Sequence, residues 1–273
     1  MKKSIKTLIA SGVLASTMVA GGIVSTAFAE EEKPTADLSV ALLSQYVWRG
    51  YELSEDSIVI QPSMTVGYKG FGFNLWGNLD TDYFGMVEGN TTTGGANFNE
   101  TDVTLSYDGS MDKIGYGVGY IYYALDDGLL DEQEVYVSLS YDTLLSPSLT
   151  IYRNFSHTVG WYVLAGISHS VPLTDSISLD LGATASYINF ADETEVPDPS
   201  DPTDAYSGFH DGVLSASVTV PVAEYISITP SLSYSFPLSG DAKDVLEAAN
   251  AKGTEITGNA DTFYGGVTAS LSF

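Results

Sequence analysis

Apolar and polar residues alternate with a period of two along most of the chain. In residues 58–68 the apolar face comprises Ile58, Ile60, Met64, Val66 and Tyr68. The opposite face comprises Ser57, Gln61, Ser63, Thr65 and Lys69. The same alternation recurs in residues 226–236 and 262–273. Successive side chains of a β-strand point to opposite sides, so the pattern predicts strands with one apolar and one polar face.

The full pattern predicts about twelve such strands, bounded by turn residues and charged segments. Their expected ranges are 38–49, 57–69, 71–81, 101–109, 114–124, 133–142, 148–155, 160–171, 177–189, 208–221, 225–236 and 262–273. After the first 29 residues, no apolar run reaches the roughly 18 to 20 residues that a membrane-spanning helix needs. The chain is therefore expected to be all-β.

The lengths of the connections decide between a soluble sandwich and a membrane barrel, because both folds alternate in this way. Every second connection is short, as at 69–71 and 221–225, whereas the others are mostly long and acidic, as at 82–100, 190–207 and 237–261. Outer-membrane barrels combine tight periplasmic turns with long external loops, and an even strand number leaves both termini on the periplasmic side. We therefore expect a closed antiparallel transmembrane β-barrel.

The first 29 residues are expected to be a cleaved secretory signal peptide, which leaves 30–273 as a single barrel domain. Lys2, Lys3 and Lys6 precede an apolar stretch, and "AFA" at 27–29 has the small-x-small form of a cleavage site. Export together with a barrel fold predicts the outer membrane of a Gram-negative bacterium, with outer-membrane lipid as a partner.

Charge and cysteine content exclude several classes of function. The chain has 10 basic and 35 acidic residues, and three of the basic residues lie in the expected signal peptide, so seven remain against 35 acids. Such a chain repels the phosphates of nucleic acid, which excludes nucleic acid as a partner. The absence of cysteine excludes disulfides and thiol chemistry. No motif indicates a metal site or a cofactor.

Two of the long loops have distinctive compositions. Residues 193–204, "ETEVPDPSDPTD", favour an extended and solvated conformation, and their aspartates either bind calcium weakly or only form a soluble cap. Residues 240–253 predict a short helix with Asp241 as N-cap and Gly253 at the C-cap. This helix is expected to fold over the mouth or into the lumen, or to lie outside as a lid.

The chain ends in "TASLSF", with apolar residues at every second position before Phe273. The final strand is thus expected to face lipid on its aromatic side. This ending resembles the terminal signal that outer-membrane barrels present to their assembly machinery. We therefore expect Phe273 and its strand to be recognised by that machinery.

The opening of the barrel resembles a known family. The segment "ALLSQYVWRGYELSED" at 41–56, followed by "QPSMTVGYKGFGFNLWGNLDTDY" at 61–83, is similar to the first hairpin of the TorF-type porin family. Members of that family begin with a Ser-x-Tyr-Val-aromatic-Arg-Gly segment. The resemblance covers roughly residues 38–83 and the terminal strand, and it implies an outer-membrane pore without naming a solute.

The first strand is expected to leave the membrane near Gly50. Tyr46 and Trp48 share its apolar parity, so they are expected in the outer aromatic girdle; stacking on a ligand is the alternative. Arg49 has the opposite parity and would point into the lumen, where a guanidinium needs a partner. A bidentate carboxylate suits arginine best, although a rim salt bridge is also possible. The carboxylates expected within its reach are Asp80, Glu52 and Asp82.

Polar residues of inward parity are the candidates for a pore lining. They are Gln45, Arg49, Gln61, Lys69, Asn74, Asn78, Asp80, Asp102, Glu134 and Asp180. Trp76 shares this parity and is expected to narrow the channel or to pack on Arg49. Acidic side chains in the lining and loops attract cations and repel anions, so we expect a cation-leaning channel for ions or small solutes.

Two other functions stay open at this point. A structural or adhesive barrel with a plugged lumen is compatible with inward aromatics such as Trp76, Tyr123, Tyr136 and Tyr152. A barrel-type hydrolase is suggested only by "FHDG" at 209–212, which has no nucleophile motif beside it. The sequence therefore predicts a protein that is not an enzyme.

Overall fold

The computed structural model describes residues 33–54, 56–83, 86–87, 90–91, 95–126, 130–251 and 257–273. The expected signal peptide, residues 1–29, lies outside these ranges, as does the expected helix C-cap at Gly253. Within the described ranges, no helix has the length and apolar character needed to cross a membrane.

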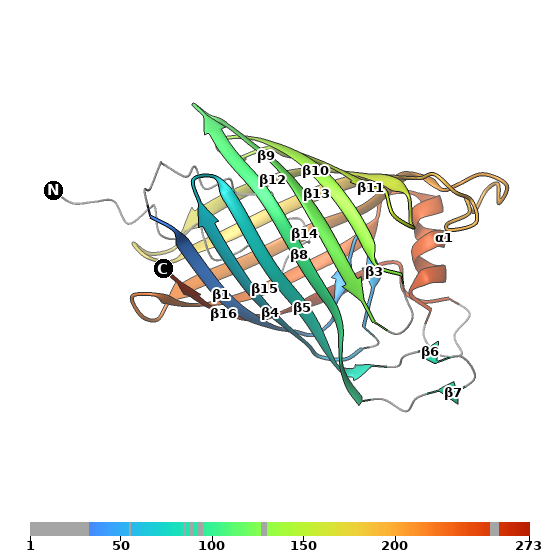
Figure 1. The fold of residues 1–273 in the computed structure, drawn as a ribbon, viewed down its shortest axis with the longest axis horizontal. Helices are drawn as coiled ribbons and strands as arrows, with labels where there is room; N and C mark the ends of the chain where they lie inside the picture. The colour runs from blue at the N-terminus through green and yellow to red at the C-terminus, as the bar shows by residue number, and fades with distance from the viewer. Residues whose placement is uncertain are drawn as a thin grey trace.

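Twelve strands of the described chain form a closed antiparallel barrel (Figure 1). In chain order they are β1 (Thr35–Leu43), β4 (Val59–Tyr68), β5 (Phe71–Tyr83), β8 (Gly95–Met111), β9 (Ile114–Leu125), β10 (Glu132–Tyr141), β11 (Ser148–Asn154), β12 (Gly160–Pro172), β13 (Ser178–Phe190), β14 (Ser207–Pro221), β15 (Ile226–Pro237) and β16 (Thr262–Ser272). The barrel closes between β1 and β16, with Asp37 opposite Ser272 and Leu43 opposite Gly266. The predicted fold is thus confirmed.

The alternation along β1 shows why the sheet closes. Leu38, Val40 and Leu42 are 42%, 44% and 51% exposed on the outer wall, whereas Ser39 and Ala41 are buried inside. Lipid offers no hydrogen-bond partner to the backbone, so a sheet can cross a membrane only if it has no free edge. The polar face, which would be costly in lipid, is turned to the interior.

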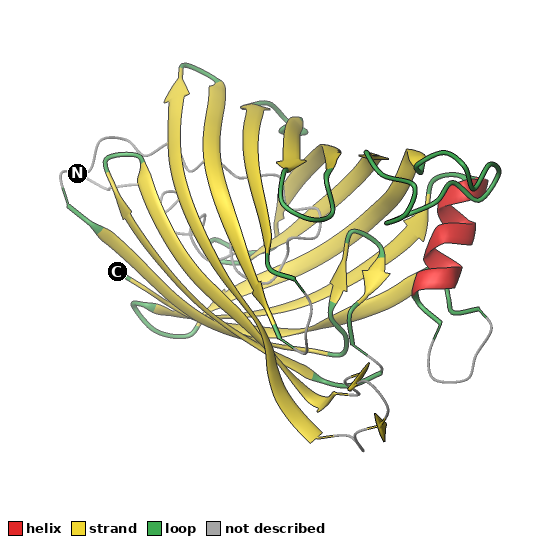
Figure 2. Cartoon of the chain, turned by 45° about the vertical axis from the view of Figure 1, so that its right-hand side comes forward, coloured by secondary structure: helices red, strands yellow, loops and turns green. Residues whose placement is uncertain are grey.

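The two ends of the barrel differ. Both the start of β1 and the chain end lie at one end, and the helix with the longer loops lies at the other (Figure 2). Lys69 and Gly70, with φ of 50° and 84°, make the tight turn between β4 and β5 at the end that carries the termini. Lys69 is exposed there, so its expected place in the pore lining is wrong: it belongs to the turn and not to the strand.

The helix α1 (Gly240–Ala249) lies at the other end of the barrel, beside β14 and β15. Its N-cap is Ser239, whose hydroxyl accepts from the Ala242 N–H at 3.0 Å, and its C-cap is Asn250. The expected N-cap at Asp241 is therefore wrong by two residues. Ala242, Val245 and Leu246 are buried, and this face packs on a cluster of inward side chains, which comprises Tyr162, Ile188 and Tyr206.

The first strand ends earlier than the sequence predicts. β1 stops at Leu43, and a separate two-stranded hairpin follows, made of β2 (Val47–Trp48) and β3 (Tyr51–Glu52). A second small sheet pairs β6 (Met86–Val87) with β7 (Asn90–Thr91). Parity counted along an uninterrupted first strand therefore fails after Leu43, which changes the places of Tyr46 and Trp48, whereas Arg49 still lies inside the barrel.

Candidate constriction inside the barrel

The β2–β3 hairpin turns tightly at Arg49 and Gly50. Trp48 pairs with Tyr51, and the two turn residues have φ of 52° and 81°. Positive φ at both central residues is characteristic of a type I′ turn, which suits Gly50. For a residue with a side chain this region costs roughly 1–2 kcal/mol, so the surroundings must hold Arg49 in place.

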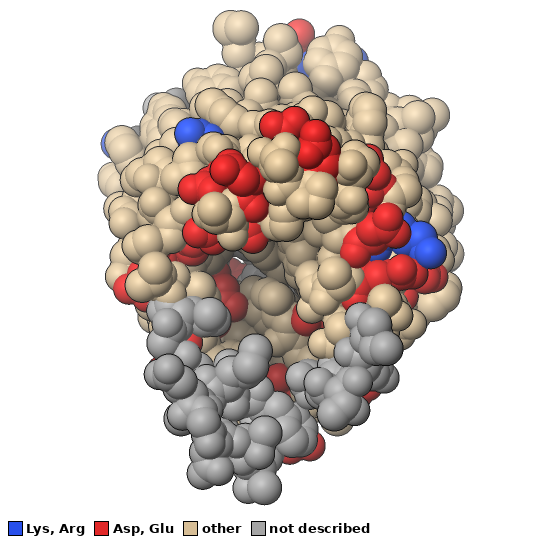
Figure 3. All heavy atoms as spheres, turned by 90° about the vertical axis from the view of Figure 1, so that its right-hand side faces the viewer, with Lys and Arg blue, Asp and Glu red and all other residues tan. Residues whose placement is uncertain are grey.

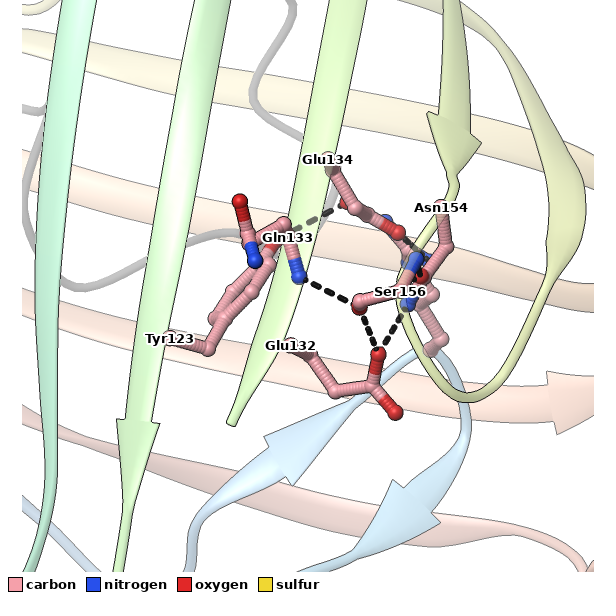
Figure 4. A network of polar contacts seen from close by, with 7 residues as sticks. Tyr123, Glu132, Gln133, Glu134, Asn154 and Ser156 are labelled. Atoms are coloured by element: carbon pink, nitrogen blue, oxygen red, sulfur yellow. Dashed lines mark hydrogen bonds and ion pairs between the residues drawn. The ribbon is translucent and has the colours of Figure 1, made fainter. Parts of the chain in front are cut away.

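Arg49 reaches from this turn to Glu134 on β10. Its Nη1 and Nη2 donate to Glu134 Oε1 and Oε2 at 2.8 Å and 2.7 Å. The Tyr123 hydroxyl donates to the same carboxylate at 2.9 Å, as Figure 4 shows. The contact is the bidentate geometry expected for Arg49, but the three carboxylates expected as partners were Asp80, Glu52 and Asp82. All three lie near the first hairpin in sequence, whereas Glu134 is 85 residues away.

The pair is buried and flanked by aromatic rings. The side chains of Arg49 and Glu134 are 9% and 1% exposed. The guanidinium carbon lies 4.2 Å from the ring centroids of both Trp48 and Tyr162, at which distance cation–π attraction is effective. Burial lowers the pKa of Arg49, but the Glu134 carboxylate more than offsets this, so the pKa is raised and the guanidinium stays charged.

The backbone carbonyls of the turn are held as well. His210 Nε2 lies 3.0 Å from the Arg49 carbonyl, and Asn250 Nδ2 donates to the Gly50 carbonyl at 3.2 Å. Because a carbonyl only accepts, His210 carries a proton on Nε2. Asn250 Oδ1 also accepts from the Glu52 N–H at 2.9 Å. The C-cap of α1 thereby fixes the hairpin.

His210 reaches the turn because of an irregularity in β14. The register between β13 and β14 shifts between Ala185 and Tyr187, so that His210 and Asp211 together lie opposite Ser186. Such a β-bulge redirects side chains, and neighbouring residues that would face opposite sides both point inward. His210 and Asp211 are 0% and 2% exposed. Strict alternation could not predict this arrangement.

The expected girdle position of Tyr46 and Trp48 is wrong. Both rings lie inside the barrel: Tyr46 is 5.5 Å from Trp76, and Trp48 is 6.1 Å from Tyr123, measured between ring centroids. Burial and the nearby carboxylate of Glu100 raise the pKa of the Tyr46 phenol. Because the chain leaves the wall at Leu43, these aromatics serve to pack the hairpin and do not meet lipid.

The hairpin crosses the lumen from wall to wall. Val47 packs with Val213 of β14 and Tyr264 of β16, while Arg49 binds Glu134 of β10. In the order of the closed barrel, β10 and β16 lie six positions apart among twelve strands, which places them on opposite sides. The hairpin therefore narrows the lumen near the end that carries α1.

Several expected lining residues lie on the inner faces of β4 and β5. Gln61 Nε2 donates to Asn78 Oδ1 at 3.0 Å, and Asn74 Nδ2 donates to the Ser63 hydroxyl at 2.8 Å. Gln61 and Asn78 are almost completely buried. Asp80, also buried, accepts from the Ser57 hydroxyl.

The remaining candidates lie elsewhere on the inner wall. Gln45 Oε1 accepts from the Thr262 hydroxyl at 3.0 Å, just after β1 ends. Asp102 is 3% exposed on β8, and Asp180 is half-buried on β13 opposite Ser170. Trp76 packs on Tyr46, and its ring is not among those that flank Arg49 in the described part of the chain.

A second polar network supports β10 beside the constriction. Glu132 accepts from Asn154 Nδ2 at 2.9 Å and from the Ser156 hydroxyl (Figure 4). It also accepts from the N–H and hydroxyl of Thr158 at 2.9 Å and 2.7 Å. These bonds join the start of β10 to the end of β11 and its loop. They fix the strand from which Glu134 reaches inward.

Positive charge is almost confined to the outside of the barrel. Among the basic residues that the structure describes, Arg49 is the one whose side chain lies in the interior. Arg153 stacks on the exposed Trp161 at 4.9 Å, and Lys243 pairs with Glu247 on α1 at 3.0 Å. The others are Lys33 before β1, and Lys69 and Lys113 in the turns that precede β5 and β9. Figure 3 shows the mouth hollowed at its centre, with Asp and Glu side chains around the hollow.

No family model matches this chain, and no curated protein matches it. Among solved structures, a NanC porin matches with 10% identity and a TM-score of 0.51, over 87% of this chain and all of the porin. A KdgM porin in complex with oligogalacturonate matches with 11% identity and a TM-score of 0.49, over 88% of this chain and 99% of the porin. At these identities the similarity concerns the fold.

The exposed side chains of the outer wall and the barrel fold both indicate a protein that spans a membrane. Large apolar side chains stand exposed around the barrel, as lipid requires and water would not favour. The similarity to the NanC barrel extends over the whole of that porin. The chain is a closed β-barrel whose apolar outer wall suits a lipid bilayer.

Proposed function

We propose that the protein is a porin-like channel for passive diffusion of ions or small solutes, with a preference for cations. The distribution of charge in the interior carries this proposal. Arg49 is neutralised by Glu134, whereas Asp80 is a buried inward carboxylate without an ion pair to any described basic residue. A cleft lined by one sign of charge raises the local concentration of the opposite ion.

The hairpin supplies the selective part of the path in this proposal. It narrows the lumen between β10 and β16, and the inward residues at the same end of the barrel form the lining. These are Gln45, Gln61, Asn78, Asp80, Asp102 and Glu134, with Trp76 beside them; Asn74 and Asp180 continue the lining toward the end that carries the termini. A solute has to pass the hairpin, so small solutes would diffuse through more easily than large ones.

The rest of the inner wall suits hydrated ions. Its buried polar side chains include many small hydroxyls, namely Ser39, Ser63, Ser138, Thr150, Thr229, Ser233, Thr268 and Ser270. Hydroxyl groups both donate and accept hydrogen bonds, so they replace water contacts without holding a charge. This favours passage over permanent binding.

A plugged structural or adhesive barrel is the alternative, and the same hairpin favours it. Side chains from β10, β14 and the C-cap of α1 hold the hairpin at Arg49, Gly50 and Glu52. A segment held in this way is compatible with a plug as well as with a constriction. The hollow in Figure 3 supports the channel. Measured conductance separates the two.

A catalytic role is not proposed for His210 and Asp211, the pair that suggested a hydrolase. His210 binds the Arg49 carbonyl and the Tyr206 hydroxyl, and Asp211 accepts from the Ser186 hydroxyl at 2.6 Å. Their hydrogen bonds explain them as structural supports of the turn.

Membership of the TorF-type porin family remains part of the proposal. Its support is the Ser-x-Tyr-Val-aromatic-Arg-Gly segment, which in this chain begins at Ser44 and ends in the turn at Gly50. We further propose that the assembly machinery reads the last strand. Phe273 is 63% exposed, and its ring stacks on Tyr225 at 5.7 Å, where a partner could reach it.

Conductance of the purified chain in a planar lipid bilayer tests the proposed function. We expect stepwise currents that scale with salt concentration. Proteoliposomes can be tested in parallel for release of small uncharged solutes. A folded barrel that is heat-resistant in detergent but gives no current would establish the plugged alternative instead.

A further inference from the structure

A small cavity lies where the hairpin turn meets the inner wall of β12 to β16. Its volume is about 10 Å³, which is room for one water-sized species. Arg49 and Gly50 of the turn form one side. The polar side chains on the wall side are those of Tyr162, Thr184, Asp211, Ser235 and Tyr264.

Three hydroxyls that line this cavity have unused hydrogen-bonding capacity. Thr184 Oγ1 and Ser235 Oγ have no partner in the described part of the chain, and the Tyr264 hydroxyl has none of good geometry, although Ser233 lies beside it. Ser235 and Tyr264 are 1% and 4% exposed, so bulk water does not compensate them. Buried polar groups are nearly always satisfied, and several unsatisfied ones around one cavity indicate a bound species.

The strand register brings these groups together. Thr184 on β13 pairs with Val213 on β14, which pairs in turn with Ser235 on β15. Asp211 precedes Val213 by two residues, so its side chain lies on the same inner face. The site is therefore part of the wall and is positioned by backbone pairing.

The carboxylate in this site carries an unbalanced charge. Asp211 is 2% exposed, and its Oδ1 accepts from the Tyr162 hydroxyl at 3.0 Å and from Ser186. Among the described residues it has no ion pair. Arg49, the nearest guanidinium, uses both terminal nitrogens on Glu134.

We propose that this cavity binds a monovalent cation of about the size of sodium, with oxygen ligands from Asp211, Ser235, Thr184 and Tyr264. Buried charges are paired or coordinate a metal ion, and a water molecule would satisfy the hydroxyls but not the charge. A single carboxylate is too little charge for a calcium site, which typically has several. The ion links side chains of β13, β14, β15 and β16 next to Gly50, and so stabilises the part of the wall on which the hairpin packs.

This inference does not rest on conduction, because the site stabilises the fold whether or not the lumen is open. The test compares the heat-induced unfolding midpoint of the refolded barrel in sodium chloride and in choline chloride at equal ionic strength. Choline is too large for the cavity. We expect sodium to raise the midpoint by about 2–4 °C relative to choline. Equal midpoints for the wild type would overturn the proposal.

Two alanine variants assign the effect to the cavity. Ser235→Ala removes a ligand hydroxyl, and we expect it to abolish the sodium-dependent rise while the barrel stays folded in choline. Ser270→Ala is the matched control, because Ser270 is also a buried hydroxyl without a partner in the described chain but does not line the cavity. If the rise persists in Ser235→Ala, or vanishes equally in Ser270→Ala, the cavity holds only water and the proposal fails.

Discussion

Arg49 and Glu134 are 85 residues apart in the chain and meet in two parallel hydrogen bonds of 2.8 Å and 2.7 Å inside the barrel. The carbonyl of the same Arg49 accepts from His210 on β14. One residue thus joins an inward hairpin to two different parts of the wall. This explains how a turn with an arginine at positive φ persists, since its contacts outweigh the local strain.

Replacing Arg49 by Ala should widen the constriction and strengthen the preference for cations. The variant loses the interior positive charge and leaves the buried Glu134 carboxylate without its ion pair, with the Tyr123 hydroxyl as a remaining donor, at a cost of roughly 3–5 kcal/mol. Single-channel conductance and the unfolding midpoint in detergent measure both effects. Lys69→Ala is the matched control, because Lys69 also precedes glycine in a two-residue turn but lies exposed at the far rim. Equal conductance in all three proteins would show that Arg49 does not narrow the path.

Replacing Glu134 by Gln should shift selectivity toward anions. The substitution keeps the shape of the side chain but leaves the Arg49 guanidinium without its neutralising carboxylate. Reversal potentials under a salt gradient report the change. Glu247→Gln on α1 is a suitable comparison, because it breaks an exposed ion pair with Lys243 that contributes at most about 1 kcal/mol. A reversal potential that moves as far in this comparison protein would contradict a specific role for Glu134.

Replacing Gly50 by Ala should weaken the packing of the β2–β3 hairpin against α1 and β14. The residue has φ of 81°, and an added Cβ would lie 3.0 Å from Leu246 Cδ1 and 3.3 Å from Asp211 Cβ. We expect a lower unfolding midpoint and noisier single-channel currents. Gly240→Ala at the start of α1 is the control, since its Cβ would meet nothing within 4 Å. The interpretation fails if the two variants behave alike.

Cation preference should persist from neutral pH down to about pH 4 and weaken below it. In the loop after β13, the hydroxyl of Ser200 lowers the pKa of Asp198, and that of Thr203 lowers the pKa of Asp201. A carboxylate with a lowered pKa stays charged to a lower pH. Its contribution to the stability of the folded loop is lost only as the pH falls through the lowered pKa. Reversal potentials measured in steps from pH 7 to pH 3 check this. An early loss of selectivity near pH 6 would assign it to other groups.

The fold followed from the sequence because barrel strands obey a local rule. In β4, Gln61 and Ser63 are buried inside while Val66 and Tyr68 are exposed on the outer wall, as the alternation predicted. The alternation of short and long connections supplied the second condition, because it favoured a closed barrel over a sandwich. Both signals depend only on neighbours in the chain.

The constriction did not follow, because its contacts join segments far apart in sequence. Tyr46 and Trp48 suit a membrane rim and a packed interior equally well, so parity alone assigned them to the wrong side. One signal was present: Arg-Gly flanked by Val-Trp and Tyr-Glu is the pattern of a two-residue hairpin. His210 was missed for another reason, since a β-bulge cannot be recognised from alternation.

The reversal potential of the wild-type protein in a planar bilayer tests the central claim most directly. With potassium chloride tenfold more concentrated on one side, we expect a steady current with a reversal potential on the cation side of zero, because Glu134 neutralises Arg49 and the inward carboxylate of Asp80 has no basic partner among the described residues. A potential at zero or on the anion side, or a folded barrel without current, would contradict it.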